Sequence, residues 1–247
     1  AMPGLAPMAG RSGGNGGLGG GAIAGIVGGI GAAVVVAVVG GLLVAVVVRR
    51  RRAAAEARAG RLVFFIGAGV SRDAGLPNWQ DLLTALHRDD VSEEEKSTLN
   101  NLDPRDHATL IQLALGGRGE LLARLAGEIG RYERFGLTHS LLASIGAEQA
   151  VTTNYDNLYE RACTRPGRAL DDELTVLPYG RVAENRPWLL KLHGSLDQLD
   201  RDDHIVLTRP DYMSLARERS ALFGIVQALL VTKHLLFVGY SLSDEDF

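Results

Sequence analysis

The apolar residues of this sequence follow two different patterns along the chain. Residues 21–48 form one unbroken run of Gly, Ala, Val, Ile and Leu, and Arg49–Arg52 follow it directly. Those 28 residues exceed the roughly 20 that a helix needs to cross the hydrocarbon core of a membrane. From residue 61 onward, shorter apolar stretches alternate with polar ones. We therefore expect one transmembrane helix followed by a folded domain.

The residues around the apolar run predict its orientation. A cleaved signal peptide carries its basic residues before a shorter apolar segment, whereas here the basic cluster follows the run. The pattern predicts an uncleaved single-pass anchor, with Arg49–Arg52 and the later domain in the cytoplasm. A Gly/Ala-rich linker is the alternative, although linkers rarely collect so many Val and Ile residues. Residues 1–20 are expected to be disordered, and residues 49–60 to form a basic juxtamembrane stem.

Small residues recur at every fourth position of the predicted span, namely Gly21, Gly25, Gly29, Ala33, Ala37, Gly41 and Ala45. On a helix they form one groove, which a second helix can approach closely. This groove predicts a homo-oligomer in the membrane. The alternative is that so many Gly and Ala residues produce the spacing by chance.

The folded part predicts strands that alternate with helices. Compact apolar runs typical of buried strands lie at 62–66, 150–153, 188–192, 205–207 and 234–238. Helical spacing of apolar residues occupies 79–87, 107–115, 120–131, 138–145 and 221–231. Pro210 fits the first turn of one more helix. This alternation indicates an α/β domain with a mainly parallel sheet.

Charge and cysteine content exclude several classes of function. The 247 residues carry a net charge of -3, and residues 1–60 hold six Arg and one Glu, so the folded part carries -8. A domain this acidic is not expected to bind nucleic acid, which requires clustered Lys and Arg. The single cysteine, Cys163, excludes a disulfide framework and a multi-cysteine zinc site within this chain.

Reactive side chains follow four of the predicted strands. They belong to the turns Gly67–Ser71, Thr153–Asp156, His193–Ser195 and Gly239–Asp244. In open α/β sheets, ligands bind in the crevice beyond the carboxyl ends of the strands. The sequence therefore predicts its ligand site at this edge of the sheet.

Each turn has a chemical and a structural interpretation. The glycines of Gly67–Ser71 permit close approach of a phosphate, although a tight turn is an equally good explanation, and Arg72 breaks the dehydrogenase fingerprint. His193 can act as a general base, or it is a core histidine bonded to a backbone carbonyl. Asn154 and Asp156 can orient a ribose or a water molecule, or they cap the next helix. The other histidines lack metal-ligand spacing and are expected to be structural or exposed.

Together these strings resemble the sirtuin superfamily, in particular its SIR2-like branch of bacterial NAD-consuming proteins. The strings that carry the resemblance are GAGVSRDAGLPNW (67–79), TTNYDNLYERA (152–162), LKLHGSLD (190–197), LTRPDY (207–212) and LLFVGYSLSDEDF (235–247). The resemblance implies a Rossmann-like NAD-binding domain over residues 61–247, with a helical insertion at about 80–140. It also implies a further helix beyond Phe247, so that the chain is expected to be truncated there.

The resemblance also implies roles for individual residues. Asn154 would orient the ribose and a water molecule, His193 would be the catalytic base, and Asp156 would give electrostatic support. The dinucleotide would be bound by Gly67, Ala68, Gly69, Ser71, Thr153, Asn154, Asp156, Gly239 and Ser241.

Departures from the sirtuin pattern narrow the implied activity. The four-cysteine zinc module of sirtuins is absent, and Asn78-Trp79-Gln80 stands where sirtuins have an aromatic–Arg pair. These departures favour the branch whose members hydrolyse NAD, several of them in anti-phage defence, with NAD as substrate and no metal. A non-catalytic NAD- or nucleotide-sensing membrane module and an NAD-dependent deacylase are the alternatives. The choice between NAD and NADP stays open.

Overall fold

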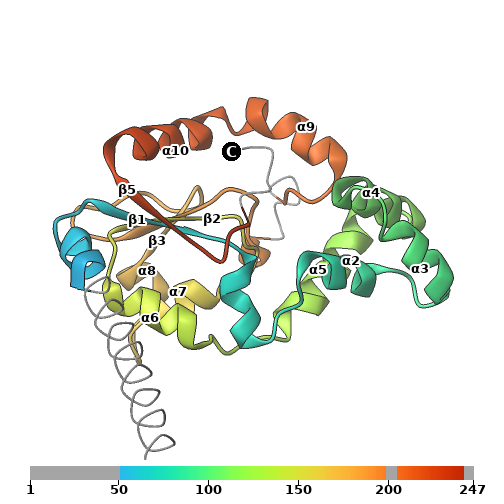
Figure 1. The fold of residues 1–247 in the computed structure, drawn as a ribbon, viewed down its shortest axis with the longest axis horizontal. Coiled ribbons are helices and arrows are strands. Elements are labelled where there is room, and N and C mark those ends of the chain that lie inside the picture. Colours follow the sequence, from blue (N-terminus) through green and yellow to red (C-terminus); the bar gives the residue numbers. More distant parts are fainter. Residues whose placement is uncertain (1–50, 199–204, 242–247) are drawn as a thin grey trace, which may run out of the picture. The chain divides into compact units, whose positions relative to one another are not determined.

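The computed structural model describes residues 51–198 and 205–241 of the chain (Figure 1). The expected disordered segment 1–20 and the expected transmembrane run 21–48 lie outside these residues. Within the described ranges, none of the helices combines the length and the apolar character that a membrane span requires. Within the predicted stem, residues 51–58 are helical.

Five parallel strands form the sheet, in the order β3-β4-β2-β1-β5. Their bounds are Leu62–Ile66 (β1), Gln149–Thr152 (β2), Thr175–Leu177 (β3), Trp188–Lys191 (β4) and His234–Val238 (β5). Every residue of β1 is buried, which explains its uninterrupted apolar sequence. The predicted α/β domain with a mainly parallel sheet is confirmed.

The register of the sheet brings the predicted turns to one level. Ile66, the last residue of β1, pairs with Thr152 in β2 and with Val238 in β5. Thr152 in turn pairs with Lys191, the last residue of β4. The chain leaves β1 toward β2 on one side and returns to pair β5 on the other, so the strand order reverses at β1. Such a switch point is where open α/β sheets bind ligands.

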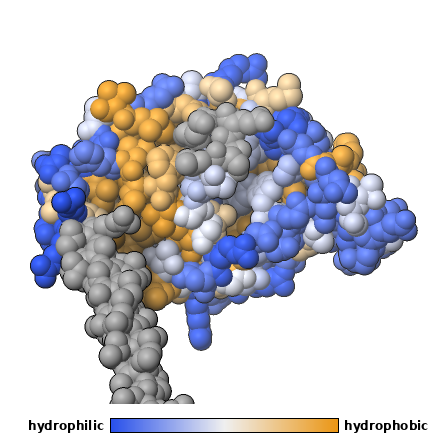
Figure 2. All heavy atoms as spheres, in the orientation of Figure 1, coloured by the Kyte–Doolittle hydropathy of each residue, from blue (hydrophilic) through white to orange (hydrophobic). Residues whose placement is uncertain are grey.

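Helices cover both faces of the sheet (Figure 1). Phe64 and Ile66 point to the face covered by α6 (Leu137–Ile145), α7 (Leu158–Cys163) and α8 (Leu170–Glu173). Val63 and Phe65 point to the opposite face, where α10 (Ser220–Thr232) contributes Val226 and Leu229. This two-residue alternation within an apolar strand supplies both halves of the core. On the face drawn in Figure 2, apolar residues gather over the sheet and α10. The helical segment at residues 79–130 is mainly hydrophilic on this face.

Four helices between β1 and α6 form an insertion, and all but the second of them contribute buried residues to an apolar core that also includes Tyr155 and Leu158. They are α2 (Trp79–Leu86), α3 (Glu93–Leu99), α4 (Pro104–Ala114) and α5 (Arg118–Gly130). Three arginine–carboxylate pairs connect the insertion to α9 (Arg209–Glu218), namely Arg118–Asp211 at 3.1 Å, Arg209–Asp106 at 2.7 Å and Arg209–Asp103 at 3.1 Å. The insertion is therefore coupled to the segment that follows β4.

Two features differ from the sequence-based expectations. The expected strand at 205–207 is a buried segment outside the sheet, because side chains satisfy its backbone: Tyr155 donates to the Val206 carbonyl, and Asp211 accepts from the Leu207 N–H. Strand β3 and helix α8 were not predicted. Both are very short, so neither displays a recognisable period.

A substitution at Gly239 can test how tightly the ends of β1 and β5 pack. Its φ is +64°, and an added Cβ would lie 2.4 Å from the Val70 backbone nitrogen. We expect Gly239→Ala to lower the free energy of unfolding by about 1–3 kcal/mol, because backbone must move to admit the methyl group. Gly224→Ala in α10 is the matched control, since nothing lies within 4 Å of its Cβ position. Denaturant unfolding of both variants measures the difference, and equal stabilities would contradict this packing.

A buried histidine pair in the insertion makes stability depend on pH. His87 Nε2 and His107 Nε2 lie 2.7 Å apart, so one ring donates and the other accepts. Burial lowers the pKa of both rings, that of His107 to about 4. The pair therefore stays neutral in the folded protein at neutral pH.

The expected result is a loss of stability on acidification. Above about pH 6.5 the histidines of the unfolded chain are also neutral, and the pair contributes fully. Between about pH 6.5 and 4 the unfolded chain takes up protons that the folded pair does not, which lowers the free energy of unfolding by up to about 3 kcal/mol. In urea unfolding at pH 7 and pH 4.5, His107→Leu should lose less stability than the wild type. Equal losses would show that the pair does not titrate as described.

Candidate active site

A cavity of about 680 Å³ lies beyond the carboxyl ends of the central strands. The predicted site residues that line it are Ala68, Gly69, Ser71, Thr153, Asn154, Asp156, His193, Gly239 and Ser241. Gly67 does not line the cavity, and Asp244 lies outside the described residues. Because the central strands end at the same level of the sheet, residues that are far apart in sequence line the same cavity. The insertion adds Trp79, Asp103 and Arg105 to its wall.

The glycines of the first and last turns pack backbone against backbone. The Gly67 N–H donates to the Val238 carbonyl at 3.0 Å, and the Gly69 N–H donates to the Gly239 carbonyl at 2.8 Å. A Cβ on Gly67 would lie 2.5 Å from the Gly239 oxygen, and one on Gly69 would lie 2.8 Å from it. The observed role of Gly67 is therefore to join β1 and β5. Contact of these turns with phosphate stays a prediction.

Asn154 is held with its side-chain oxygen unused by the protein. Its Nδ2 donates to the Gly67 carbonyl at 3.3 Å and to Ser71 Oγ at 3.2 Å. Because a carbonyl oxygen can only accept, the amide nitrogen must face Gly67, and this fixes the position of Oδ1. Asn154 Oδ1 is buried and receives no hydrogen bond from the described residues. A buried acceptor without a donor is unfavourable unless a ligand or water supplies one.

Ser71 forms hydrogen bonds with both Asp156 and Asn154. Its hydroxyl donates to Asp156 Oδ2 at 2.9 Å and lies 3.3 Å from His139 Nε2. With the bond from Asn154, the hydroxyl has one acceptor and two donors, which is its full capacity. The other Asp156 oxygen accepts from the N–H of Leu158, the first residue of α7, whereas the N-cap residue of that helix is Asn157.

His139 supplies the proton that completes this network. Its Nδ1 accepts from the Gly136 N–H at 3.2 Å, so Nε2 carries the hydrogen and donates to Ser71. Burial lowers the pKa of His139, with Asp156 and Asp73 opposing that shift, and the ring stays neutral at neutral pH. This role could not be predicted from the sequence, because His139 lies 68 residues from Ser71.

His193 is buried in the cavity wall just after β4. The Tyr212 ring of α9 meets it edge-on, with 5.3 Å between ring centroids and an interplanar angle of 77°. The Arg105 guanidinium of the insertion lies over the Tyr212 ring, 5.6 Å from the ring centroid. This stack connects the insertion to His193 and explains why residues of α4 line the cavity.

Two more residues of the site were missed by sequence reasoning. Lys191 is completely buried in β4, and its Nζ donates to the Asp156 carbonyl at 2.6 Å and pairs with Glu160 at 2.8 Å. Lysine inside an otherwise apolar strand was the available signal, since a buried charge requires a partner.

Among residues 51–198 and 205–241, no three His, Cys, Asp or Glu side chains are grouped so that they could hold a metal ion.

Comparison with known proteins supports the resemblance drawn from the motifs. The family model of the SIR2-like domain matches residues 148–247. The chain is 25% identical over 190 residues to Defense-associated sirtuin 2 of Bacillus subtilis, covering 76% of this chain and 18% of that protein. It is 29% identical over 200 residues to the NAD(+) hydrolase ThsA of Acinetobacter baumannii, covering 78% of this chain and 39% of that protein.

A third relative is named for a different activity. The NAD-dependent protein deacylase of Pseudomonas putida is 29% identical over 156 residues, covering 55% of this chain and 56% of that protein. This chain spans less than two thirds of the length of each of the three relatives.

Removing the Ser71 hydroxyl tests the network around Asn154 and Asp156. Ser71→Ala leaves Asp156 Oδ2, His139 Nε2 and Asn154 Nδ2 each short of one partner. We expect the free energy of unfolding to fall by about 1–3 kcal/mol, because buried polar groups become unsatisfied. The control is Ser144→Ala on the exposed side of α6, with an expected change within about 0.5 kcal/mol. Equal effects in urea unfolding would show that the Ser71 bonds contribute nothing beyond a surface serine.

Proposed function

We propose that this protein hydrolyses NAD+ at the bond between nicotinamide and ribose. The observation that carries the proposal is the buried, unused Oδ1 of Asn154 in the wall of a cavity that His193 also lines. A ribose hydroxyl or a water molecule supplies the missing donor. The cavity volume of about 680 Å³ is in the range of small-molecule sites. Relatives named NAD(+) hydrolase ThsA support the choice of substrate.

In the proposed reaction, the bond between ribose C1′ and the nicotinamide nitrogen breaks, and its electron pair leaves with nicotinamide as a neutral base. Positive charge develops on the ribose, as in glycoside hydrolysis. A water oxygen bonds to C1′, and His193 accepts the water proton before releasing it to solvent. The products are nicotinamide, ADP-ribose and one proton.

The remaining residues orient this reaction. Asn154 Oδ1 accepts a hydrogen bond from the ribose or the water, which limits their motion. The negatively charged Asp156 carboxylate stabilises the positive charge that develops on the ribose, and Ser71 holds that carboxylate in place. The backbone contact of Gly69 with Gly239 gives the two phosphates a surface without side chains.

The proposal extends to location and biological role. Residues 21–48 anchor the protein in the membrane as a single span, with Arg49–Arg52 and the catalytic domain in the cytoplasm, where NAD+ is available. The small-residue groove of the span joins copies of the chain. The relative named Defense-associated sirtuin 2 supports a role in defence, and we propose that this role is anti-phage defence by depletion of host NAD+.

Substitution of His193 and Asn154 tests the proposed chemistry. The full chain in lipid nanodiscs is incubated with NAD+, and released nicotinamide and ADP-ribose are quantified. We expect His193→Ala to lower kcat by about 10²–10⁴-fold, because general-base help is lost. Asn154→Ala should lower it by about 10²-fold through loss of orientation.

The exposed His234 at the start of β5 provides the matched control, and His234→Ala should retain the wild-type rate. A folded His193→Ala protein with near-wild-type release would contradict the assignment of the base. NAD+ binding without release by the wild type would favour a sensor. Release that requires an acetylated peptide would favour a deacylase.

A further inference from the structure

The Lys191 ammonium lies at the centre of the fold without access to solvent. Its side chain is 0% exposed, and that of its partner Glu160 is 3% exposed. Besides Glu160, Nζ donates to the Asp156 carbonyl at 2.6 Å, to Ser195 Oγ at 3.2 Å and to the Tyr155 carbonyl at 3.4 Å. All three ammonium hydrogens therefore have acceptors, and two of these acceptors are backbone atoms of the turn after β2.

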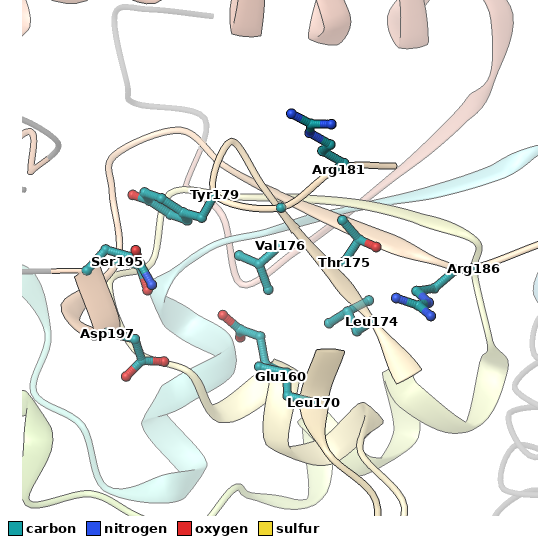
Figure 3. A pocket seen from close by; sticks show the side chains of 12 residues that line it. Glu160, Leu170, Leu174, Thr175, Val176, Tyr179, Arg181, Arg186, Ser195 and Asp197 are labelled. Atoms are coloured by element: carbon teal, nitrogen blue, oxygen red, sulfur yellow. The ribbon is translucent and has the colours of Figure 1, made fainter. Parts of the chain in front are cut away.

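These contacts place Lys191 between two cavities. Tyr155 and Asp156 line the candidate active site, whereas Glu160 and Ser195 line a second cavity of about 400 Å³. Figure 3 shows the Glu160 side chain rising from α7 into this second cavity. The ammonium thus joins the turn that carries Asn154 to two residues that line the second cavity.

Stability alone is a poor reason for such a pair. Removing two charges from water is expensive, and apolar side chains of similar volume often stabilise a protein equally well or better. Burial raises the pKa of Glu160, while the Lys191 ammonium favours its ionised form. Glu160 therefore depends on close contact with Lys191, and the geometry of this contact fixes where the ammonium lies.

Lys191 supplies hydrogen bonds to backbone carbonyls of the turn between β2 and α7. The carbonyls of Tyr155 and Asp156 lie between β2 and α7, and the Tyr155 carbonyl otherwise accepts from the Leu196 N–H. Asn154 and Asp156 are each bonded to Ser71 on the other side of the turn. The turn is consequently held from two sides, by Ser71 toward β1 and by Lys191 toward β4.

We propose that Lys191 and Glu160 form a positioning pair, which sets the place of Asn154 and Asp156 in the active site by holding the turn at residues 154–156. The inference rests on the proposed NAD+ hydrolysis for its kinetic consequence. Its structural consequence, the position of the turn, is independent of that activity.

A double substitution separates positioning from stability. Lys191→Met and Glu160→Leu each leave one partner unpaired, and each should lower the melting temperature by about 10 °C. The double variant has an apolar pair and should recover most of that loss. It lacks the Lys191 donor to the Asp156 carbonyl, while the Tyr155 carbonyl keeps only the Leu196 N–H, so kcat should remain about 10–100-fold below the wild type with little change in KM.

Trp79 reports the position of the turn without catalysis. Its ring lies 6.4 Å from the Tyr155 ring, and Trp188 is the other tryptophan of the chain. In a Trp188→Phe background, acrylamide quenching of Trp79 should change in the double variant. Leu229→Ala in α10 is the control, because it destabilises the core while leaving kcat and Trp79 quenching unchanged.

Each outcome decides the inference. Recovery of kcat together with stability in the double variant, with unchanged Trp79 quenching, would show a merely structural pair. If the double variant does not fold, Glu160→Gln decides, since it keeps the size of the side chain. A folded Glu160→Gln protein with wild-type kcat and quenching would overturn the proposal. If the wild type releases no nicotinamide, the proposed function fails, and Trp79 quenching still tests the position of the turn.

Discussion

The close backbone contact between Gly67–Gly69 and Gly239 is the constraint on which the site depends. The ends of β1 and β5 can meet only where no Cβ intervenes, and their N–H···O bonds then continue the pairing of the two strands beyond the sheet. The chain must turn sharply after Gly67, and it forms the 3₁₀ helix Ala68–Ala74. That turn directs Ser71 toward the interior, where it meets the turn that follows β2. A bulkier first turn would separate the elements that enclose the cavity.

A chain of polar contacts then crosses the base of the site. It runs from His139 through Ser71 to Asp156, and on the other side of the turn from Lys191 to Glu160. Buried polar groups favour a unique arrangement when all of their bonds are made. Asn154 Oδ1 is the exception in this chain of contacts, and functional sites are where such local inconsistencies are expected. The same network that makes the fold specific therefore leaves one acceptor for a ligand.

The insertion contributes to the site through α9. Arg118 and Arg209 join α5 and α4 to that helix, and Tyr212 on the same helix packs on His193. A shift of the insertion would reach His193 through these contacts. The position of the candidate base is consequently determined by the insertion as well as by the sheet.

The sequence alone determined the elements with strong local signals. The run at 62–66 is a strand with those bounds, because a buried parallel strand needs an apolar side chain at nearly every position. The run at 234–238 is also a strand with the predicted bounds, although it lies at the edge of the sheet and each of its residues is partly or largely exposed. The turns after four strands were placed at one edge of the sheet, since parallel strands share their direction. The short strand β3, the placement of segment 205–207 outside the sheet and the partners of Ser71 and Lys191 required the tertiary structure. Period and turn chemistry act over a few residues, whereas the bond from Ser71 to Asp156 spans 85 positions and exists only once the sheet has formed.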